Sequence, residues 1–257
     1  MKLNSKVAVV TGAASGLGHG TCMALAAAGA KIVGFDRDEV KLAKLRESLG
    51  DRVITRAVDV ADEASVKAGI DAVLNAFGAV HVAVNCAGVA DSAKTVSKGE
   101  PFPLAIWNRV IAVNLTGTFN VIRFAALAMI ANEPESEGEE RGVIVNTASG
   151  AAWQGQVGQA AYSASKAGVM GLTLPVARDL AAYGIRVVSI APGLFATAMV
   201  EGLPPKVSQS IVDRMILYPN RMGRSDEFAA LVRHIAENSY LNATTINLDA
   251  GARMQAR

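Results

Sequence analysis

The sequence predicts an α/β protein with a single doubly wound parallel sheet and helices on both of its faces. Short valine-rich runs alternate along the chain with longer stretches of helical pattern, as a parallel sheet requires. The first of these runs passes directly into a glycine-rich turn and then into a helix. The chain has 257 residues, a length that one α/β domain often reaches without internal division.

The elements are expected in a regular order. The first strand (KVAVVT) is followed by the glycine turn and by a helix that runs through Ala28 and is closed by Gly29. Further strands are expected at residues 31–35, 53–58, 80–85, 142–147, 186–190 and 245–248, and further helices near 38–49, 62–77, 104–130, 161–183 and 225–237. We divide the single domain 1–257 into a cofactor half, about 1–150, and a catalytic and substrate half, about 142–257.

Three stretches interrupt this alternation. Residues 91–103 contain Ser, Lys, Gly and two prolines, which predicts a loop. Residues 132–142 contain five glutamates, which favours a solvated loop, with a docking surface as the alternative. Residues 196–220 contain three prolines around a short helical segment after the sixth strand, on the side of the sheet where ligands bind. We therefore expect a substrate lid at about 194–220.

Composition agrees with one enzyme domain. Hydrophobic residues make up 51% of the chain and aromatic residues only 5%, so the core should be aliphatic. Cys22 and Cys86 are expected to be buried and reduced, which suits a reducing compartment. The net charge of +2 does not favour nucleic acid, the three histidines lack ligand spacing for a metal, and an uninterrupted membrane span is not expected. Without an export signal we expect a cytoplasmic location, or the mitochondrial matrix if a presequence has been removed.

The turn after the first strand predicts a phosphate-binding cradle. Glycines let the backbone turn tightly and approach a ligand closely, and the helix that follows offers free N–H groups to a pyrophosphate. The spacing is Gly-x-x-x-Gly-x-Gly, which only approximates the commoner dinucleotide fingerprint of Rossmann-type folds. The cofactor contacts expected here are Gly12, Ser15, Gly16, Leu17 and Gly18.

Asp36 ends the second strand, eighteen residues after Gly18, where an acidic residue should meet the adenosine ribose. A 2′-phosphate within about 4 Å of this carboxylate would be repelled by roughly 4 kcal/mol per charge pair at an effective dielectric near 20. Arg37 is the counterargument, because its guanidinium could reach a phosphate. We expect the Asp36 carboxylate to prevail, and the predicted cofactor is NAD.

Tyr162 and Lys166 indicate the chemistry. They lie four residues apart in a predicted helix, so the phenol and the ammonium project from one face. A nearby cation favours the phenolate and would lower the tyrosine pKa toward that of a useful base. Ser149 lies thirteen residues upstream and could hydrogen-bond the substrate oxygen that exchanges the proton. The Tyr-x-x-x-Lys pattern alone also occurs by chance on exposed helices. The glycine turn supports the catalytic interpretation of the pattern in this chain.

These elements together resemble the short-chain dehydrogenase/reductase family over nearly the whole chain. Thr11-Gly12-x-x-x-Gly16-x-Gly18 is similar to its cofactor turn, and Asp59-Val60 is similar to its adenine contact. Asn85-Cys86-Ala87-Gly88 resembles the family's Asn-Asn-Ala-Gly element, with Cys86 as a departure that leaves the turn intact. Pro192-Gly193 and Thr197 resemble the segment that closes over the nicotinamide. The catalytic tetrad implied by the resemblance is Asn114, Ser149, Tyr162 and Lys166.

The resemblance also implies what each tetrad residue does. Tyr162 takes the hydroxyl proton, Lys166 lowers the tyrosine pKa and holds the nicotinamide ribose, and Ser149 steadies the substrate oxygen. Asn114 is the family's relay residue, which positions a water near Lys166. The family further implies a homotetramer, built on helices 104–130 and 161–183 and on the segment after Leu248. Ala125, Ala126 and Ala128 are expected to need a covering partner.

Within the family, residues 107–123, 155–166 and 191–195 most resemble the short-chain 3-hydroxyacyl-CoA dehydrogenases of the type 2 group, also described as 17β-hydroxysteroid dehydrogenases type 10. This resemblance implies a short-chain 3-hydroxyacyl-CoA as substrate, and we expect contacts from Ser149, Trp153, Gln156, Leu194 and Phe195. Two alternatives stay open. One is another family member that acts on 3-oxoacyl thioesters, steroids or secondary alcohols, and the remoter one is a non-catalytic scaffold such as an RNA-processing partner.

Overall fold

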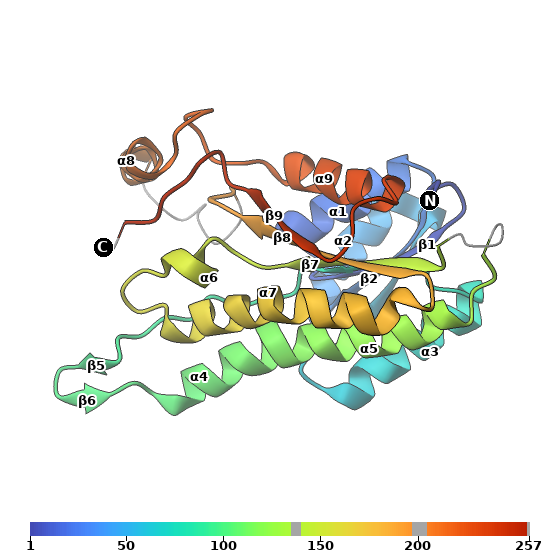
Figure 1. Cartoon of the computed structure of the whole chain (residues 1–257), viewed down its shortest axis with the longest axis horizontal. Coiled ribbons are helices and arrows are strands. Elements are labelled where there is room, and N and C mark those ends of the chain that lie inside the picture. Colours follow the sequence, from blue (N-terminus) through green and yellow to red (C-terminus); the bar gives the residue numbers. More distant parts are fainter. Residues whose placement is uncertain (135–139, 197–204, 256–257) are drawn as a thin grey trace.

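The predicted strands form one parallel sheet in the computed structural model (Figure 1), which describes residues 1–134, 140–196 and 205–255. The sheet has seven strands in the order β3-β2-β1-β4-β7-β8-β9. Their bounds are β1 Val7–Thr11, β2 Lys31–Asp36, β3 Val53–Ala57, β4 Val82–Asn85, β7 Gly142–Thr147, β8 Ile185–Pro192 and β9 Thr244–Leu248. The predicted fold class is confirmed, and the strand boundaries agree with the sequence-based ones within two residues.

Helices cover both faces of this sheet (Figure 1). One layer contains α1 (Gly16–Ala27), α2 (Glu39–Leu49) and α9 (Ser225–Glu237). The opposite layer contains α3 (Glu63–Phe77), α4 (Leu104–Ile111), α5 (Gly117–Ile130) and α7 (Ala160–Ala181). Two further helices, α6 (Ala151–Gln154) and α8 (Pro205–Met215), lie beyond the carboxyl ends of the strands.

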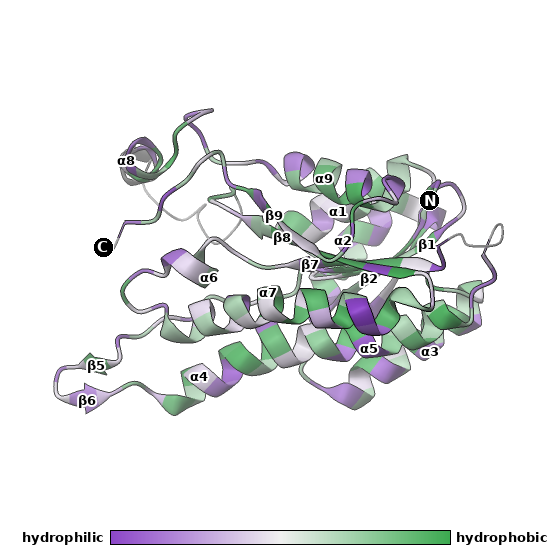
Figure 2. Cartoon of the chain, in the orientation of Figure 1, coloured by the Kyte–Doolittle hydropathy of each residue, from purple (hydrophilic) through white to green (hydrophobic). Residues whose placement is uncertain are grey.

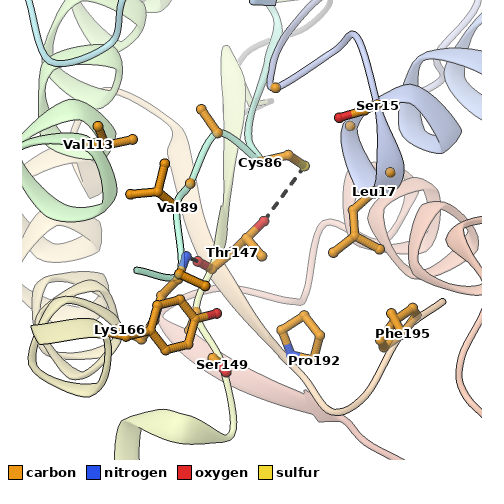
Figure 3. A pocket seen from close by; sticks show the side chains of 18 of the residues that line it. Ser15, Leu17, Cys86, Val89, Val113, Thr147, Ser149, Lys166, Pro192 and Phe195 are labelled. Carbon is orange, nitrogen blue, oxygen red and sulfur yellow. Dashed lines mark hydrogen bonds between the residues drawn. The ribbon is translucent and has the colours of Figure 1, made fainter. Parts of the chain in front are cut away.

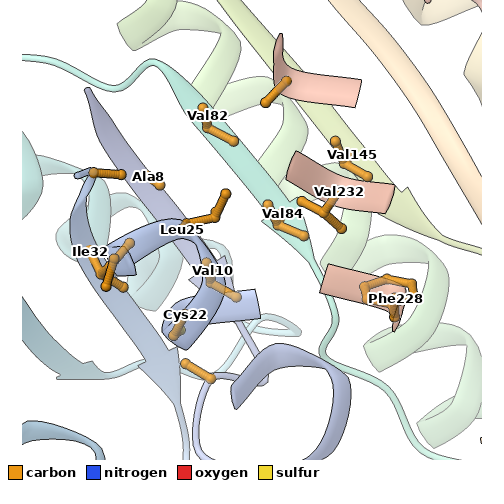
Figure 4. Packing of buried hydrophobic residues seen from close by; sticks show 14 of the residues in the cluster. Ala8, Val10, Cys22, Leu25, Ile32, Val82, Val84, Val145, Phe228 and Val232 are labelled. Carbon is orange, nitrogen blue, oxygen red and sulfur yellow. The ribbon is translucent and has the colours of Figure 1, made fainter. Parts of the chain in front are cut away.

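Alternation along the strands produces two aliphatic cores. In β1, Ala8 and Val10 belong to the core under α1 and α9, whereas Val7 and Val9 belong to the core under α3, α5 and α7. Figure 4 shows the first core, with Leu25 of α1 and helix α9 packed against the sheet. Successive side chains of a strand point to opposite faces, so strands buried on both sides need the near-continuous valine runs seen in the sequence.

The order of the strands creates a crevice between β1 and β4. The chain moves outward from β1 to β2 and β3 and then returns to β4 on the other side of β1. Where the strand order reverses in this way, the carboxyl ends of the two central strands leave room for a ligand. The Thr11 hydroxyl closes the bottom of this crevice, because it accepts from the backbone N–H groups of Cys86 and Ala87 at 3.1 Å each.

The helical run 104–130 differs from the single α-helix that the sequence predicts. Its middle turn, Ala112–Thr116, is π-helical, and α4 and α5 continue on either side of it. By length and hydropathy alone this run could cross a membrane, but half of its most apolar window is buried inside the protein, as in a core helix.

Two stretches also contain structure that the sequence analysis did not foresee. Residues 91–103, predicted to be a loop, include a small hairpin of β5 (Val96–Ser97) and β6 (Glu100–Pro101). The stretch after Ser149 forms the short helix α6. These short elements have too few residues to show a period, which is why pattern reasoning passes over them.

The prediction of a solvated glutamate loop is wrong for Glu140. Its carboxylate lies 2.5 Å from the Arg186 guanidinium, and the two side chains are only 12% and 7% exposed. Arg186 also donates to the carbonyl oxygens of Ile235, Ala236 and Leu241, so this buried charge is fully surrounded by acceptors. Residues 135–139 of the same stretch lie outside the described residues.

Candidate active site

A cavity of about 520 Å³ opens at the carboxyl edge of the sheet, above the crevice between β1 and β4. Figure 3 shows its two ends, with Ser15 and Leu17 on one side and Ser149, Lys166 and Pro192 on the other. The cavity therefore brings together the glycine turn and the catalytic residues predicted from sequence. The predicted cofactor contacts that line it are Gly12, Ser15, Gly16, Leu17, Gly18, Asp36, Asp59, Val60, Ala87, Gly88, Tyr162, Lys166, Pro192 and Gly193.

The glycine turn is shaped for close approach of backbone to backbone. Gly12 has φ +64°, and a Cβ there would lie 2.9 Å from the backbone nitrogen of Ala87. A Cβ on Gly18 would lie 2.2 Å from the Gly12 carbonyl oxygen. Neither contact is tolerable, so both positions require glycine and keep the mouth of the turn open.

The start of α1 offers unused hydrogen-bond donors to the cavity. Ser15 is the N-cap residue, but its side chain makes no capping bond, and the first turn contains no acidic residue. The early amides of a helix lack partners within the helix and favour an anion. A pyrophosphate therefore fits this cradle, and the residues that would hold it are those of the turn itself.

Asp36 lies at the far end of the same cavity, oriented by the backbone. Its carboxylate accepts from the N–H groups of Ala14 and Asp38, at 3.1 Å each. Arg37 turns toward Asp59 instead, with 3.6 Å between its Nε and the Asp59 Oδ2. Among the described residues, the Asp36 carboxylate is therefore held by backbone N–H groups and not by a cationic side chain.

Asn85 differs from the other predicted cofactor contacts. It is buried and does not line the cavity; its amide donates to the Asn146 side chain at 2.9 Å and so ties β4 to β7. Cys86, expected to be a buried thiol, instead lines the cavity beside Thr147 (Figure 3). Burial raises the pKa of the Cys86 thiol to about 11, so it is protonated at neutral pH. Cys22 is buried as predicted, in the core under α1.

Ser149 and Tyr162 meet across the cavity. Ser149 lies two residues past the end of β7, where its hydroxyl accepts from the Ala151 N–H at 3.1 Å. Tyr162 lies in the first turn of α7 and lines the same cavity. Burial raises the pKa of Tyr162, and a hydrogen bond with the Ser149 side chain opposes that rise. The two hydroxyls are therefore placed to hold one substrate oxygen between them.

Lys166 behaves differently from the sequence-based expectation. Its Nζ lies 5.8 Å from the centroid of the Tyr162 ring and donates to the Thr147 carbonyl oxygen at 2.7 Å. Burial lowers the pKa of Lys166 to about 8. The expected lowering of the tyrosine pKa by this cation is not observed, because burial disfavours the charged form of each group and so raises the pKa of Tyr162 and lowers that of Lys166.

Asn114 lies in the π-helical turn and is completely buried. Its amide oxygen accepts from the Val89 N–H, and its amide nitrogen donates to the Val89 carbonyl oxygen, at 2.8 Å each. The same nitrogen also reaches the Ser165 hydroxyl at 3.1 Å. Asn114 therefore positions the strand-end segment beside Gly88 and the helix that carries Lys166. Its predicted relay role stays a prediction.

The predicted substrate contacts divide into two groups. Gln156, Leu194 and Phe195 line the cavity together with Ser149. Trp153 does not line it: this residue lies on α6 with 45% of its surface exposed. Thr197, a predicted cofactor contact, lies outside the described residues, as does most of the expected lid before α8.

Sequence reasoning missed several cavity residues. Gln159 lies one helical turn before Tyr162, so the spacing of the helix could have indicated it. Met254 has no such signal, because only the return of the C-terminal segment across 100 residues brings it to the cavity. Within the described ranges, no three His, Cys, Asp or Glu residues are grouped closely enough to hold a metal ion.

A parallel sheet with a phosphate cradle at its switch point and a Ser-Tyr-Lys trio in the same cavity defines a dinucleotide-dependent oxidoreductase. The family model of the short chain dehydrogenases matches residues 6–208, which cover most of the sheet and all four tetrad residues. The chain belongs to the short-chain dehydrogenase family.

Relatives resemble it over nearly their whole length. The 3-hydroxyacyl-CoA dehydrogenase type-2 of Drosophila melanogaster is 47% identical over 98% of this chain and 99% of its own. The human protein of the same name is 48% identical over 97% of this chain and 95% of its own. The crystal structure of 3-hydroxyacyl-CoA dehydrogenase type-2 from Mycobacterium avium superposes with a TM-score of 0.93 at 36% identity, covering 100% of this chain and 98% of the other.

Proposed function

We propose that this oxidoreductase interconverts a short-chain 3-hydroxyacyl-CoA and its 3-oxoacyl-CoA with NAD as cofactor. The observation that carries the substrate class is the near-full-length identity of 47–48% to relatives that bear this activity in their names. The cavity supports the reaction type, because it joins a pyrophosphate cradle to the Ser149 and Tyr162 hydroxyls. A non-catalytic scaffold would need neither the pyrophosphate cradle nor the pair of hydroxyls.

The residues of the chain manage the proton. A bound nicotinamide would supply the acceptor for the hydride that leaves the carbon carrying the hydroxyl. Tyr162, as its phenolate, takes the hydroxyl proton in the same step, and it returns that proton to the oxygen in the reverse direction. Ser149 donates to the substrate oxygen. Lys166, fixed by the Thr147 carbonyl oxygen, provides a donor at the nicotinamide end of the cavity.

The proposed preference for NAD rests on Asp36. Its carboxylate is held by two backbone N–H groups at the edge of the cavity, where ribose hydroxyls could donate to it. A 2′-phosphate there would face a like charge. Arg37, which could have compensated, lies beside Asp59.

Asp36→Ala should therefore reduce the difference in binding affinity between NAD and NADP. In the unmodified protein we expect NAD to bind at least about tenfold more tightly than NADP, because about 1.4 kcal/mol of repulsion already gives that ratio. Titration of both cofactors by fluorescence would measure the four dissociation constants. Asp38→Ala is a matched control, since Asp38 caps α2 through the Lys41 N–H and does not line the cavity. Equal affinity of the unmodified protein for NAD and NADP would contradict the assignment.

The substrate class can be tested by initial rates with NAD against a panel of alcohols. We expect kcat/KM for 3-hydroxybutyryl-CoA to exceed the values for a steroid and for a simple secondary alcohol, because remote contacts to coenzyme A can be used in the transition state. We expect the S alcohol to be favoured, from the family resemblance alone. A higher kcat/KM for the steroid or the plain alcohol would favour another member of the family. An RNA complex without any turnover would favour the scaffold.

We also propose a homotetramer, although one predicted reason for it is wrong. Ala125, Ala126 and Ala128 are buried within a single chain and need no partner. Other apolar side chains on the same helical layer are exposed, and Figure 2 shows hydrophobic colouring along α4 and α5. These exposed side chains are Leu104, Trp107, Phe119, Leu127 and Leu174.

Changing Phe119 and Leu127 together to glutamate should therefore reduce the size of the assembly. Both side chains are about half exposed or more, and burying two charges between subunits would be unfavourable. Light scattering at micromolar concentration measures the mass. Val40→Glu is the control, because Val40 is 71% exposed on α2 in the opposite helical layer. A monomer peak for the unmodified chain would refute the proposal.

A further inference from the structure

The last described residues, 249–255, reach the cavity at Met254; we refer to them as the C-terminal strap. Its residue Met254 lines the same cavity as Ser149 and Tyr162. A Cβ placed on Gly150 would lie 4.0 Å from the Met254 Cε. The methyl end of the thioether therefore lies beside the residue that follows Ser149, although neither proton transfer nor the phosphate cradle uses it.

Two hydrogen bonds fix the strap against the segment after Ser149. The Met254 N–H donates to the Gln154 side-chain oxygen at 3.0 Å, and the Gln156 side-chain amide donates to the Gln255 carbonyl oxygen at 3.0 Å. Both glutamines lie within seven residues of Ser149. The position of Met254 is thus set relative to the hydroxyl that holds the substrate oxygen.

On its other side the strap packs against α8. Met254 and Leu194 contact a small apolar cluster that contains Val212 and Met215 of that helix. The Arg253 backbone N–H donates to the Met215 carbonyl oxygen at 2.8 Å. Met254 therefore lies between the catalytic segment and α8, and it is only half-buried, so one side of it faces the cavity.

The cavity wall offers two kinds of contact to an acyl thioester. The thioester and the amides of its coenzyme need hydrogen-bond partners, and the Gln159 side chain can offer one. The alkyl end needs apolar contact, which Leu194 and Met254 offer. Methionine is unbranched and polarisable, so it fills irregular apolar space and adapts to its neighbour.

We propose that Met254 determines which acyl chain lengths the enzyme accepts, by closing the alkyl end of the substrate pocket. This inference rests on the proposed function, because it needs an acyl-CoA whose oxygen is held by Ser149 and Tyr162. Gln154 is the positioning residue, since it acts on the substrate only by holding the backbone of Met254.

Met254→Ala should raise kcat/KM for 3-hydroxyoctanoyl-CoA relative to 3-hydroxybutyryl-CoA by about tenfold or more, because one methylene in an apolar pocket changes discrimination by roughly 10- to 200-fold. Met254→Phe should lower the same ratio. The affinity for NADH, measured by fluorescence, should stay within about twofold in both variants, because the glycine turn and Asp36 lie at the other end of the cavity.

Two glutamine variants test the positioning role. Gln154→Leu removes the acceptor of the Met254 N–H and should shift the chain-length ratio in the direction of Met254→Ala. Gln154→Glu replaces the amide oxygen by a carboxylate oxygen that can accept the same hydrogen bond, and it should retain the unmodified ratio. Met23→Ala is the matched control, since Met23 lies on α1, is 38% exposed and does not line this cavity.

The experiments distinguish failure of the proposed role of Met254 from failure of the proposed function. If the unmodified enzyme oxidises 3-hydroxyacyl-CoA but Met254→Ala, folded by circular dichroism, keeps the same chain-length ratio, the role of Met254 is overturned. If the unmodified enzyme oxidises no 3-hydroxyacyl-CoA and yet turns over another alcohol, the proposed function is overturned, and the chain-length role of Met254 with it.

Discussion

Tyr162→Phe should lower turnover by about 10²- to 10⁴-fold, the contribution expected of a general acid–base group. The change removes only the hydroxyl that meets Ser149 in the cavity, so the ring and its packing on α7 are retained. Affinity for the cofactor should be largely kept, because the phosphate cradle lies at the other end of the cavity. Steady-state rates and a cofactor titration on the same preparation measure both quantities.

The rate of oxidation by the unmodified enzyme should also depend on pH, in a direction set by Tyr162. Burial raises the pKa of Tyr162, so in the ligand-free enzyme the phenol is protonated at neutral pH. Oxidation needs the phenolate, and because burial raises the tyrosine pKa above its ordinary 10.0, kcat/KM for oxidation should rise from neutral pH and still be rising at pH 9. Tyr183→Phe is the control, since Tyr183 lies just beyond α7 and is 45% exposed. Normal turnover by Tyr162→Phe would rule out the proposed proton transfer.

Lys166→Met should abolish most of the activity and at the same time stabilise the ligand-free protein. Burial lowers the pKa of Lys166 from an ordinary 10.5 to about 8, which corresponds to roughly 3 kcal/mol of destabilisation of the charged form at neutral pH. Loss of the hydrogen bond to the Thr147 carbonyl oxygen offsets about 1 kcal/mol of the gain. We expect a net increase of about 2 kcal/mol in the free energy of unfolding near pH 7, measured with urea.

The sign of the pH effect follows from proton linkage. Between about pH 8 and pH 10.5 the unfolded chain holds a proton on Lys166 that the folded chain has released. The free energy of unfolding of the unmodified protein should therefore rise with pH across this window, and the advantage of Lys166→Met should disappear. Lys67→Met serves as control, because Lys67 is 61% exposed beside Asp71. An unstabilised Lys166→Met variant at pH 7 would show that the folded protein solvates this ammonium.

Much of the fold was predictable because its signals are local. The valine runs and the caps of the helices lie within a few residues of one another, so strand and helix positions could be derived from spacing. The glycine turn and the Tyr162–Lys166 pair are likewise local, and the structure places both in one cavity. The π-helical turn at Ala112–Thr116 was not predictable, because its residues fit an α-helix equally well.

Errors in the site came from contacts between distant segments. Asn85 lies on β4, next to the strand that carries the glycine turn, but its side chain pairs with Asn146 of the adjacent strand β7 and does not line the cavity. Burial of Lys166 depends on every element packed around it, so no pattern near Tyr162 could show which effect dominates its pKa. Met254 reaches the cavity only because the strap crosses the molecule after β9.

The π-helical turn sets how the side chains of α5 are rotated about the helix axis relative to those that precede it in the run 104–130. Within the turn, Asn114 must face Val89; after it, Val121, Ile122 and Ala125 must face the sheet. Each residue of an α-helix advances the direction of its side chain by about 100°. Deleting a single residue such as Ala112 could restore regular winding, but it would rotate one of these two sets away from its partner. The run 104–130 should thus be intolerant of single-residue deletions. Such a deletion would leave the hydropathy of the run almost unchanged but would change which side chains face the sheet.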